Sequence, residues 1–186
     1  RGPLSIAPSH HVSLHRLPPV LRAFTRRHPQ VHLELGFMDS EVACRGVEQG
    51  DIELGVVTLP PPGSSPLTCL AIWTDLLVPA AATDHPLRRA RRPTPAELTR
   101  HPAILPARGT YTRRLIDAAL GPSQIETRME THYLETIKML VTAGLGWSLL
   151  PDTMVDAELR LPGTGLRVAR KLGIVHHPRR TLSNAA

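Results

Sequence analysis

The chain has 186 residues, of which 41% are hydrophobic and only 3% are aromatic. This length is large for one compact domain and small for two full ones, but it is enough to bury a sizeable aliphatic core. No apolar run reaches the ~18 residues that a membrane helix needs, so we expect no membrane contact. The chain opens with RGPLSIAPSHH, without a secretory signal or an initiating methionine. We therefore expect a fragment of a longer, cytoplasmic protein.

The formal net charge of +6 comes almost entirely from arginine, because Lys138 and Lys171 are the only lysines. The arginines are scattered along the sequence, and no aromatic residues lie among them to stack on bases. We interpret them as a solvated surface and not as a direct DNA-binding face. The two cysteines, Cys44 and Cys69, form no CxxC motif and are expected to be reduced thiols in the core.

The first third of the chain alternates strand patterns with helix patterns. Strands are expected at 3–7, 31–35 and 51–57, and helices at about 17–28 and 40–50, with a polar loop at 8–13. His28-Pro29 ends the first of these helices. Ser40 is the candidate cap of the second, which Gly50 stops. This order is typical of a largely parallel, doubly wound sheet.

The rest of the chain carries a second set of strands and helices. Strands are expected at 67–73, 76–82, 103–107, 125–131 and 145–151, and extended chain at 166–178. Helices are expected near Pro95 with Thr94 as cap, and at 109–121, 133–143 and 152–159, while 180–186 begins another. Two such sets predict two small lobes with a ligand cleft outside the carboxyl ends of the strands.

Five motifs in order make the chain recognisable as a whole. They are LSIAPSHHVSLHRLPPVLRAFTRRHPQVHLEL, VEQGDIELGVV, DHPL at 84–87, LETIKMLVTAGLGWSLLP at 134–151 and HHPRRTLSNAA at 176–186. With these motifs the sequence resembles the effector-binding domain of LysR-type transcriptional regulators over nearly its full length. Glu53 stands where the family usually has Asp, which is a conservative departure.

The resemblance implies an α/β fold of two Rossmann-like lobes with an interlobe cleft, the type 2 periplasmic-binding-protein-like fold. Lobe I would comprise 1–76 and 162–186, and lobe II 77–161. A small anionic effector would bind in the cleft and change the DNA-binding geometry of the oligomer. DNA would be contacted by a winged helix-turn-helix domain that is absent from this fragment.

The resemblance also implies a homo-oligomer, a dimer of this domain and a tetramer of the full-length protein. We expect Leu17, Leu21 and Phe24 to supply part of the interface between copies.

The candidate effector-binding residues lie where helices begin or strands end. Free N–H groups at a helix start favour an anionic ligand, and a Ser hydroxyl can donate to a carboxylate. Each candidate also has a structural alternative, such as capping by Ser9 or Ser13, the start of a loop at Thr58, or packing of Tyr133. The histidine pair departs from the family's Ser/Thr-rich loop and would add positive charge at mildly acid pH. The candidates are Ser9, His10, His11, Thr58, Thr110, Tyr111, Thr112, His132 and Tyr133.

Catalysis is not expected, because the chain has no GxSxG, HExxH, P-loop or catalytic cysteine signature. Gly144 and Gly146 follow a helix and precede a strand, which is the reverse of a dinucleotide-binding loop. No cofactor or metal is expected. His10, His11 and His15 are not expected to have the i, i+4 geometry of a helical zinc pair. Two alternatives stay open, a transporter's solute-binding protein and a metal-responsive regulator that uses His10, His11 and His132.

Overall fold

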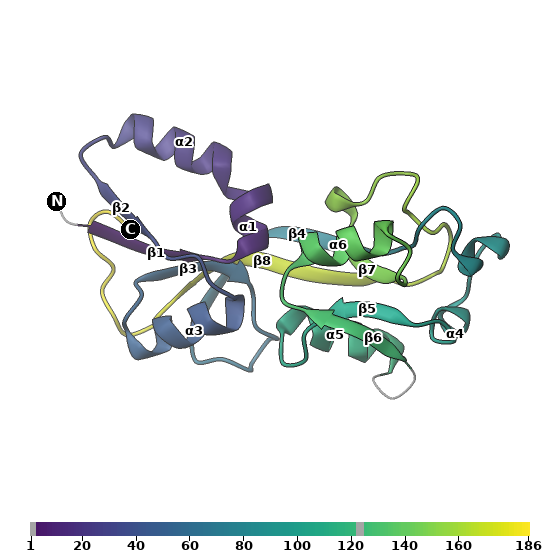
Figure 1. Cartoon of the computed structure of the whole chain (residues 1–186). Helices are drawn as coiled ribbons and strands as arrows, with labels where there is room; N and C mark the ends of the chain where they lie inside the picture. The colour runs from purple at the N-terminus through teal and green to yellow at the C-terminus, as the bar shows by residue number, and fades with distance from the viewer. Residues whose placement is uncertain (1–2, 122–124) are drawn as a thin grey trace. The chain divides into compact units, whose positions relative to one another are not determined.

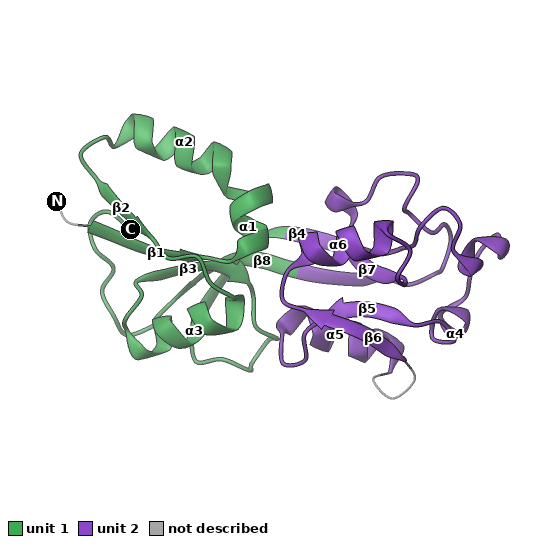
Figure 2. Ribbon diagram, viewed as in Figure 1, with its two compact units in different colours: residues 1–73, 171–186 green, residues 74–170 purple. Residues whose placement is uncertain are grey.

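The computed structural model describes residues 3–121 and 125–186, in two compact units (Figure 2). Unit 1 comprises Arg1–Trp73 and Lys171–Ala186, and unit 2 comprises Thr74–Arg170. The strands β4 (Thr68–Ala80) and β8 (Val168–His176) contain the two changeover points. The chain therefore passes from one unit into the other within continuous strands. The lobe boundaries predicted from the sequence lie between residues 76 and 77 and between residues 161 and 162, which differ from these changeover points.

Unit 1 is built on parallel strands. The first strand, β1 (Pro3–Pro8), pairs in parallel with both β2 (His32–Leu35) and β3 (Leu54–Thr58), and β8 adds to β3 in the antiparallel direction. Three helices connect these strands, α1 (His10–His15), α2 (Leu17–Arg27) and α3 (Ser40–Gln49). Figure 1 shows α2 and α3 on opposite faces of the strands. The predicted α/β fold class is confirmed.

Unit 2 has a parallel and an antiparallel strand pair. The strands β5 (Ala103–Pro106) and β6 (Thr127–Thr131) run parallel, while β4 pairs antiparallel with β7 (Ser148–Pro151). A bridge between Ala103 and Trp147 links the two pairs. The helices are η1 (Pro86–Arg89), α4 (Pro95–Leu98), α5 (Tyr111–Leu120), α6 (Leu134–Thr142) and η3 (Asp152–Met154).

Four predicted elements differ from the structure. The two strands expected at 67–73 and 76–82 form the single strand β4. A helix expected at 152–159 is only the short turn η3, because the Asp156 carboxylate accepts the amide of Leu159 at 3.0 Å and competes with helical bonding. The segment 180–186 holds a turn, with the amide of Ala186 on the carbonyl of Ser183, and no helix.

The glycines of the segment 144–147 have the conformations that the sequence suggests. Gly144 has φ +83° after α6, and its amide donates to Val141 while that of Leu145 donates to Leu140. This is the hydrogen-bond pattern of a glycine-terminated helix. A Cβ at Gly146 would lie 2.7 Å from the carbonyl oxygen of Pro102, so the chain can approach β5 closely only without a side chain.

A second close approach of backbones lies in unit 1. A Cβ at Gly173 of β8 would lie 1.9 Å from the carbonyl oxygen of Leu70 of β4. The contact is between two backbones, so no rotation of a side chain would relieve it. Position 173 therefore requires glycine although its φ is not positive.

One arginine is a structural centre of unit 2. The side chain of Arg113 is 2% exposed and pairs with Asp117 at 2.9 Å and Glu130 at 3.1 Å. It also donates to the carbonyl of Pro106 at 3.0 Å and to the hydroxyl of Thr127 at 3.3 Å. Arg113 thus ties α5 to β5 and β6, and the interpretation of the arginines as a solvated surface is wrong for this residue.

The same network perturbs a carboxylate. Burial alone would raise the pKa of Glu130. Hydrogen bonds from the Arg108 amide and from the guanidinium groups of Arg113 and Arg108 outweigh burial and lower that pKa.

Among the cysteines, Cys44 is buried and Cys69 is exposed on β4, so the expectation of two core thiols holds only for Cys44.

Replacing Arg113 with Met should lower the free energy of unfolding by about 3 kcal/mol, because the partly buried Asp117 loses its partner at 2.9 Å and Glu130 keeps only Arg108 among the described residues. Urea denaturation of the chain measures this change. The neighbouring substitution Arg114→Met, at an exposed position, should change the unfolding free energy by less than about 0.5 kcal/mol. Equal effects of the two substitutions would contradict a structural role for Arg113.

A histidine caps η1. The Nδ1 atom of His85 accepts the amide of Leu87 at 3.1 Å, and its ring meets that of His101 edge-on at 5.5 Å between centroids. Burial lowers the pKa of His85, the charge of His101 lowers it further, Asp84 opposes the change and Arg88 adds to it. The neutral imidazole is therefore the form that the fold favours.

The His85 ring should make stability depend on pH. Its pKa is lower in the folded than in the unfolded chain, so its contribution to stability is complete above about pH 6.5 and is lost as pH falls below that value. His85→Asn keeps an acceptor but does not titrate, so its unfolding free energy should fall less between pH 7 and pH 5. The control is His32→Asn, at an exposed position of β2. Parallel pH curves for wild type and His85→Asn would refute the assignment.

Candidate effector-binding site

Three buried hydroxyl residues lie at the carboxyl edge of the strands of unit 1. The amide of Ser9 donates to the carbonyl of Val56 at 3.0 Å, which places Ser9 beside the end of β3. The amide of Thr58, the last residue of β3, donates to the hydroxyl of Ser40 at 3.0 Å. Ser9, Ser40 and Thr58 are 6%, 7% and 5% exposed. The structure therefore brings two predicted residues, Ser9 and Thr58, to one edge and adds Ser40.

The capping roles expected for these serines are wrong. Ser9 is at the N-cap position of α1 but makes no capping bond through its side chain. The hydroxyl of Ser13 donates back to the carbonyl of Ser9 at 2.7 Å. Ser40 is the first residue of α3, whose N-cap is Asp39. Within residues 3–121 and 125–186, the buried hydroxyl of Ser9 has no hydrogen-bond partner, which is costly unless a ligand or water satisfies it.

The histidines of α1 differ from the expected loop. His10 is half-buried and His11 is buried, and the ring of His11 lies 4.6 Å from that of His15 between centroids. His11 and His15 are four residues apart on a helix, so the expectation that they lack i, i+4 geometry is wrong. The described part of the chain nevertheless contains no group of three or more residues arranged to hold a metal ion.

The candidates of unit 2 also lie at a carboxyl edge of parallel strands. Pro106 and Thr131, the last residues of β5 and β6, are paired in register, and the amide of Ala107 donates to the carbonyl of Thr131 at 3.1 Å. The segments 107–112 and 131–133 therefore leave the two strands side by side. Sequence reasoning predicted both segments, and the structure brings them together.

Thr110 caps α5, as predicted. Its hydroxyl accepts the amide of Arg113 at 3.1 Å and donates to the carbonyl of Ala107 at 2.8 Å. Tyr111 is half-buried at the first helical position and Thr112 is buried at the second. The cap occupies the amide of Arg113, while the amides of Tyr111 and Thr112 have no acceptor within the helix, and such groups suit an anion.

The start of α6 lies at the same edge. Tyr133 is the N-cap residue, one position before the helix, and is 49% exposed. Its amide donates to the hydroxyl of Thr131 at 3.3 Å, so Thr131 makes the local turn. His132 between them is exposed. The structure therefore leaves the Tyr133 ring and the His132 imidazole exposed at this edge.

A buried ion pair was missed by sequence reasoning. Arg170 of β8 donates to the Asp75 carboxylate of β4 from Nη2 at 2.9 Å and from Nε at 3.1 Å. Its Nη1 donates to the hydroxyl of Thr112 at 3.1 Å. The side chains of Arg170 and Asp75 are 2% and 0% exposed. The signal was Asp75 within the apolar strand β4 and Arg170 within β8, since buried charges need a partner.

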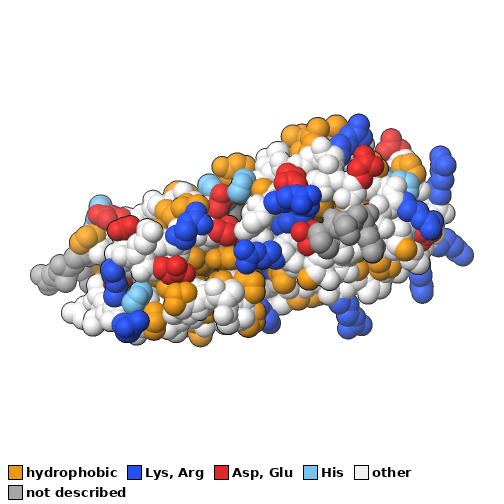
Figure 3. Space-filling view, turned by 90° about the horizontal axis from the view of Figure 1, so that it is seen from below, with side chains coloured by type: hydrophobic (Ala, Val, Ile, Leu, Met, Phe, Trp, Pro, Cys, Tyr) orange, Lys and Arg blue, Asp and Glu red, His pale blue; other side chains and the backbone are white. Residues whose placement is uncertain are grey.

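The described residues on the face drawn in Figure 3 form no basic stripe. Figure 3 shows the Lys and Arg side chains of one face in separate places, with acidic side chains between them. Arg88 of η1 is used internally, because it donates to the carbonyls of Ala81, Ala82 and Glu158. Through residues 3–121 and 125–186, every helix is too short or too polar to span a bilayer.

The whole chain, residues 1–186, matches the family model of the LysR substrate binding domain. The HTH-type transcriptional regulator CbbR of Xanthobacter flavus is 35% identical over 146 residues, which cover 76% of this chain and 44% of CbbR. The chain spans about half the length of the curated relatives it matches.

Two solved structures are similar in fold. The regulatory domain of Synechocystis PCC6803 CcmR in complex with 2-PG superposes with a TM-score of 0.83 at 21% identity, covering 99% of this chain and 91% of that one. The effector binding domain of QuiR in complex with shikimate gives a TM-score of 0.84 at 15% identity, with coverages of 100% and 91%. With a family model that matches from end to end, this chain belongs to the LysR substrate-binding domain family.

Proposed function

We propose that this domain senses a small anionic effector and controls DNA binding by a LysR-type transcription regulator. The observation that carries the proposal is the buried Ser9 hydroxyl, without a described partner, at the carboxyl edge of parallel strands. The ligands in the CcmR and QuiR structures, 2-PG and shikimate, are both small carboxylates. The family match favours this role over a transporter's solute-binding protein or a metal sensor.

In this proposal each unit supplies its own contacts. In unit 1 the Ser9 hydroxyl donates to the carboxylate. Thr58 lies at the same edge of the strands. The half-buried His10 and the buried His11 follow Ser9 in the chain. Helix α3 starts there too, but its N-cap residue Asp39 and Glu41 in its first turn are acidic, so its start is not counted among the anion contacts.

In unit 2 the start of α5, from Thr110 to Thr112, offers a helix terminus to an anion. His132 and Tyr133 follow the neighbouring strand and provide an imidazole and a ring with a hydroxyl. Both edges are formed by the ends of parallel strands, where ligands of open α/β sheets bind.

Regulation requires that the effector favours one arrangement of the regulator over another. Tight binding alone shifts no equilibrium, because only differential affinity for two arrangements does so. The name of CbbR supports a helix-turn-helix region in the intact regulator. We propose that effector binding changes the spacing of such regions on DNA.

Ser9→Ala and Thr110→Ala should each reduce effector-induced stabilisation. Thermal shift with shikimate, 2-phosphoglycolate and a panel of other small carboxylates measures it, since a ligand at 100 times its Kd stabilises the folded state by about 2.7 kcal/mol. The double variant should lose the ligand-induced shift. Thr110→Ala also removes a cap worth about 1 kcal/mol, so shifts are compared with each variant's own ligand-free Tm.

Matched controls for this test are Ser64→Ala in an exposed loop and Thr142→Ala at the exposed end of α6. Both should keep the full ligand-induced shift. An undiminished shift in the Ser9→Ala/Thr110→Ala protein would disprove the site assignment.

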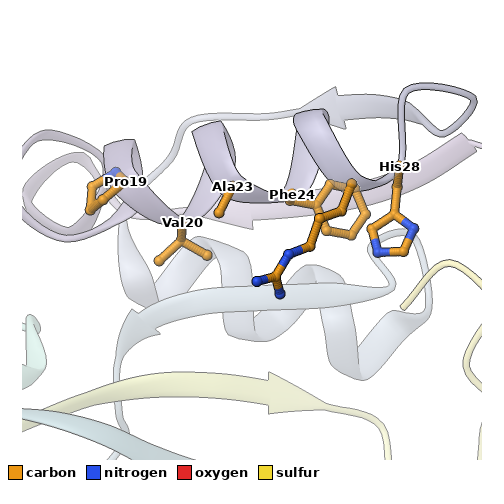
Figure 4. Close-up of a pocket in the computed structure, with 6 residues that line it drawn as sticks. Pro19, Val20, Ala23, Phe24 and His28 are labelled. Carbon is orange, nitrogen blue, oxygen red and sulfur yellow. The ribbon is translucent and has the colours of Figure 1, made fainter.

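A groove along α2 is the surface that we propose for the homo-oligomer. Leu17 is buried and Leu21 packs with it against Val12, so these two leucines stabilise unit 1 itself, contrary to their expected role between copies. Other residues of α2 line a groove of about 460 Å³ (Figure 4). Val20 in this groove is 49% exposed. The groove is lined by Pro19, Val20, Ala23, Phe24, Arg27 and His28.

We propose that this groove binds a second copy of the chain. Its lining is mostly apolar, with Phe24 packed on the His28 ring at 5.0 Å, and two residues with cationic or imidazole groups lie at one end. An apolar centre with a polar border is the usual composition of an interface between copies.

Val20→Glu should weaken self-association at least tenfold, because the carboxylate would be buried without a partner. Sedimentation equilibrium of the chain over a concentration series measures the effect. Val42→Glu on α3, where Val42 is 42% exposed, is the matched control and should associate as the wild type does. Equal association of the Val20→Glu and wild-type chains would rule out this face.

A further inference from the structure

Arg170 connects the start of α5 to both strands that pass between the units. Its guanidinium contacts Asp75 of β4 through Nε and Nη2 and Thr112 of α5 through Nη1. Asp75 and Arg170 each lie within two residues of a changeover point between the units. The three residues belong to unit 2 and are all buried.

We infer that Arg170 is a positioning residue that holds the first turn of α5 in the geometry required for effector binding. This inference rests on the proposed function, because it assigns the role through the contact of Arg170 with Thr112. The guanidinium is planar and rigid, so the two bonds to Asp75 determine the direction of the third bond to Thr112.

The first turn of α5 is held from two sides. Thr112 is bound by Arg170, and the next residue, Arg113, reaches Pro106, Thr127 and Glu130 of β5 and β6. Arg113 anchors the first turn to β5 and β6, whose carboxyl ends form the predicted binding edge. Arg170 anchors the same turn to β4 and β8. Removal of the Arg170 contact should therefore leave the helix formed but loosen its first turn.

Arg170 acts through Thr112 and is not itself an anion ligand in this inference. Its charge is opposed by Asp75 at 2.9 Å in an environment with 2% and 0% exposure. A buried arginine already paired with a carboxylate attracts a further anion weakly, because the pair is neutral as a whole. Buried ion pairs contribute little net stability. The main contribution of this pair is therefore a defined orientation of the Arg170 guanidinium.

The test is a double-mutant cycle on the 186-residue chain. Arg170→Lys keeps the charge opposite Asp75 but cannot hold the planar three-way geometry, and Thr112→Val removes the hydroxyl at nearly constant volume. Each single variant should exchange the amides of Arg114 and Leu115 about tenfold faster, as expected for loss of one charge-assisted hydrogen bond. Amides of α6 should exchange at the wild-type rate and serve as the internal control.

Affinity for 2-phosphoglycolate and for shikimate, measured by calorimetry, is the second readout. Each single variant should bind the probe about tenfold more weakly, and the double variant no more weakly than either single one, because both changes break one bond. Additive losses, or unchanged exchange at Arg114 and Leu115, would overturn the inference. The exchange cycle decides the inference even if the wild type binds neither probe, an outcome that would count against the proposed ligand class alone.

A second pair of variants guards against misfolding. If Arg170→Lys unfolds the chain, Asp75→Leu/Arg170→Met removes both charges, which is tolerated far better than removal of one. This double variant should fold, should show the faster exchange at Arg114 and Leu115, and should show no further effect of Thr112→Val. A further loss from Thr112→Val in that background would again overturn the inference.

Discussion

A guanidinium group cannot lie in a protein interior without a counter-charge, and the position of Arg170 makes this constraint central to unit 2. Transfer of each ion from water costs several kcal/mol, so Arg170 and Asp75 are stable in the interior only together. Their pairing requires β4 and β8 to lie side by side with these residues facing each other. The Arg170 guanidinium then donates to Thr112 in a fixed direction. The position of the start of α5 therefore depends on two strands that are distant in sequence.

The alternation of strands and helices could be predicted from sequence because it depends on local periodicity and on residues that end helices. Gly50 and Gly144 both have positive φ at helix ends, and Thr94 and Thr110 both cap helices as expected. The continuity of β4 could not be predicted, because Thr74-Asp75 has the composition of a turn. Arg170, a partner 95 residues away, stabilises Asp75 within the strand.

The candidate site was predictable to the level of its edges. Ser9, Thr58 and Thr110 follow strand ends or open helices, and sequence order alone places such residues at carboxyl edges. The use of each hydroxyl was not predictable, since it depends on tertiary neighbours: Ser40 binds the amide of Thr58 instead of capping a helix. The burial of Arg113 and Arg170 was not predictable either, because a buried arginine and a surface arginine look the same in a sequence.

The contact between Gly173 and Leu70 has a consequence for anyone who builds a sensor from this domain. At that point β8 and β4 are separated by backbone atoms alone, with 1.9 Å left for the first atom of any side chain. The spacing of β4 and β8 is fixed at this point, because any side chain at position 173 would push the two strands apart. A reporter is better inserted at the exposed loop around Gly63, where a Cβ would meet nothing within 4 Å, than near the strands whose spacing Gly173 sets.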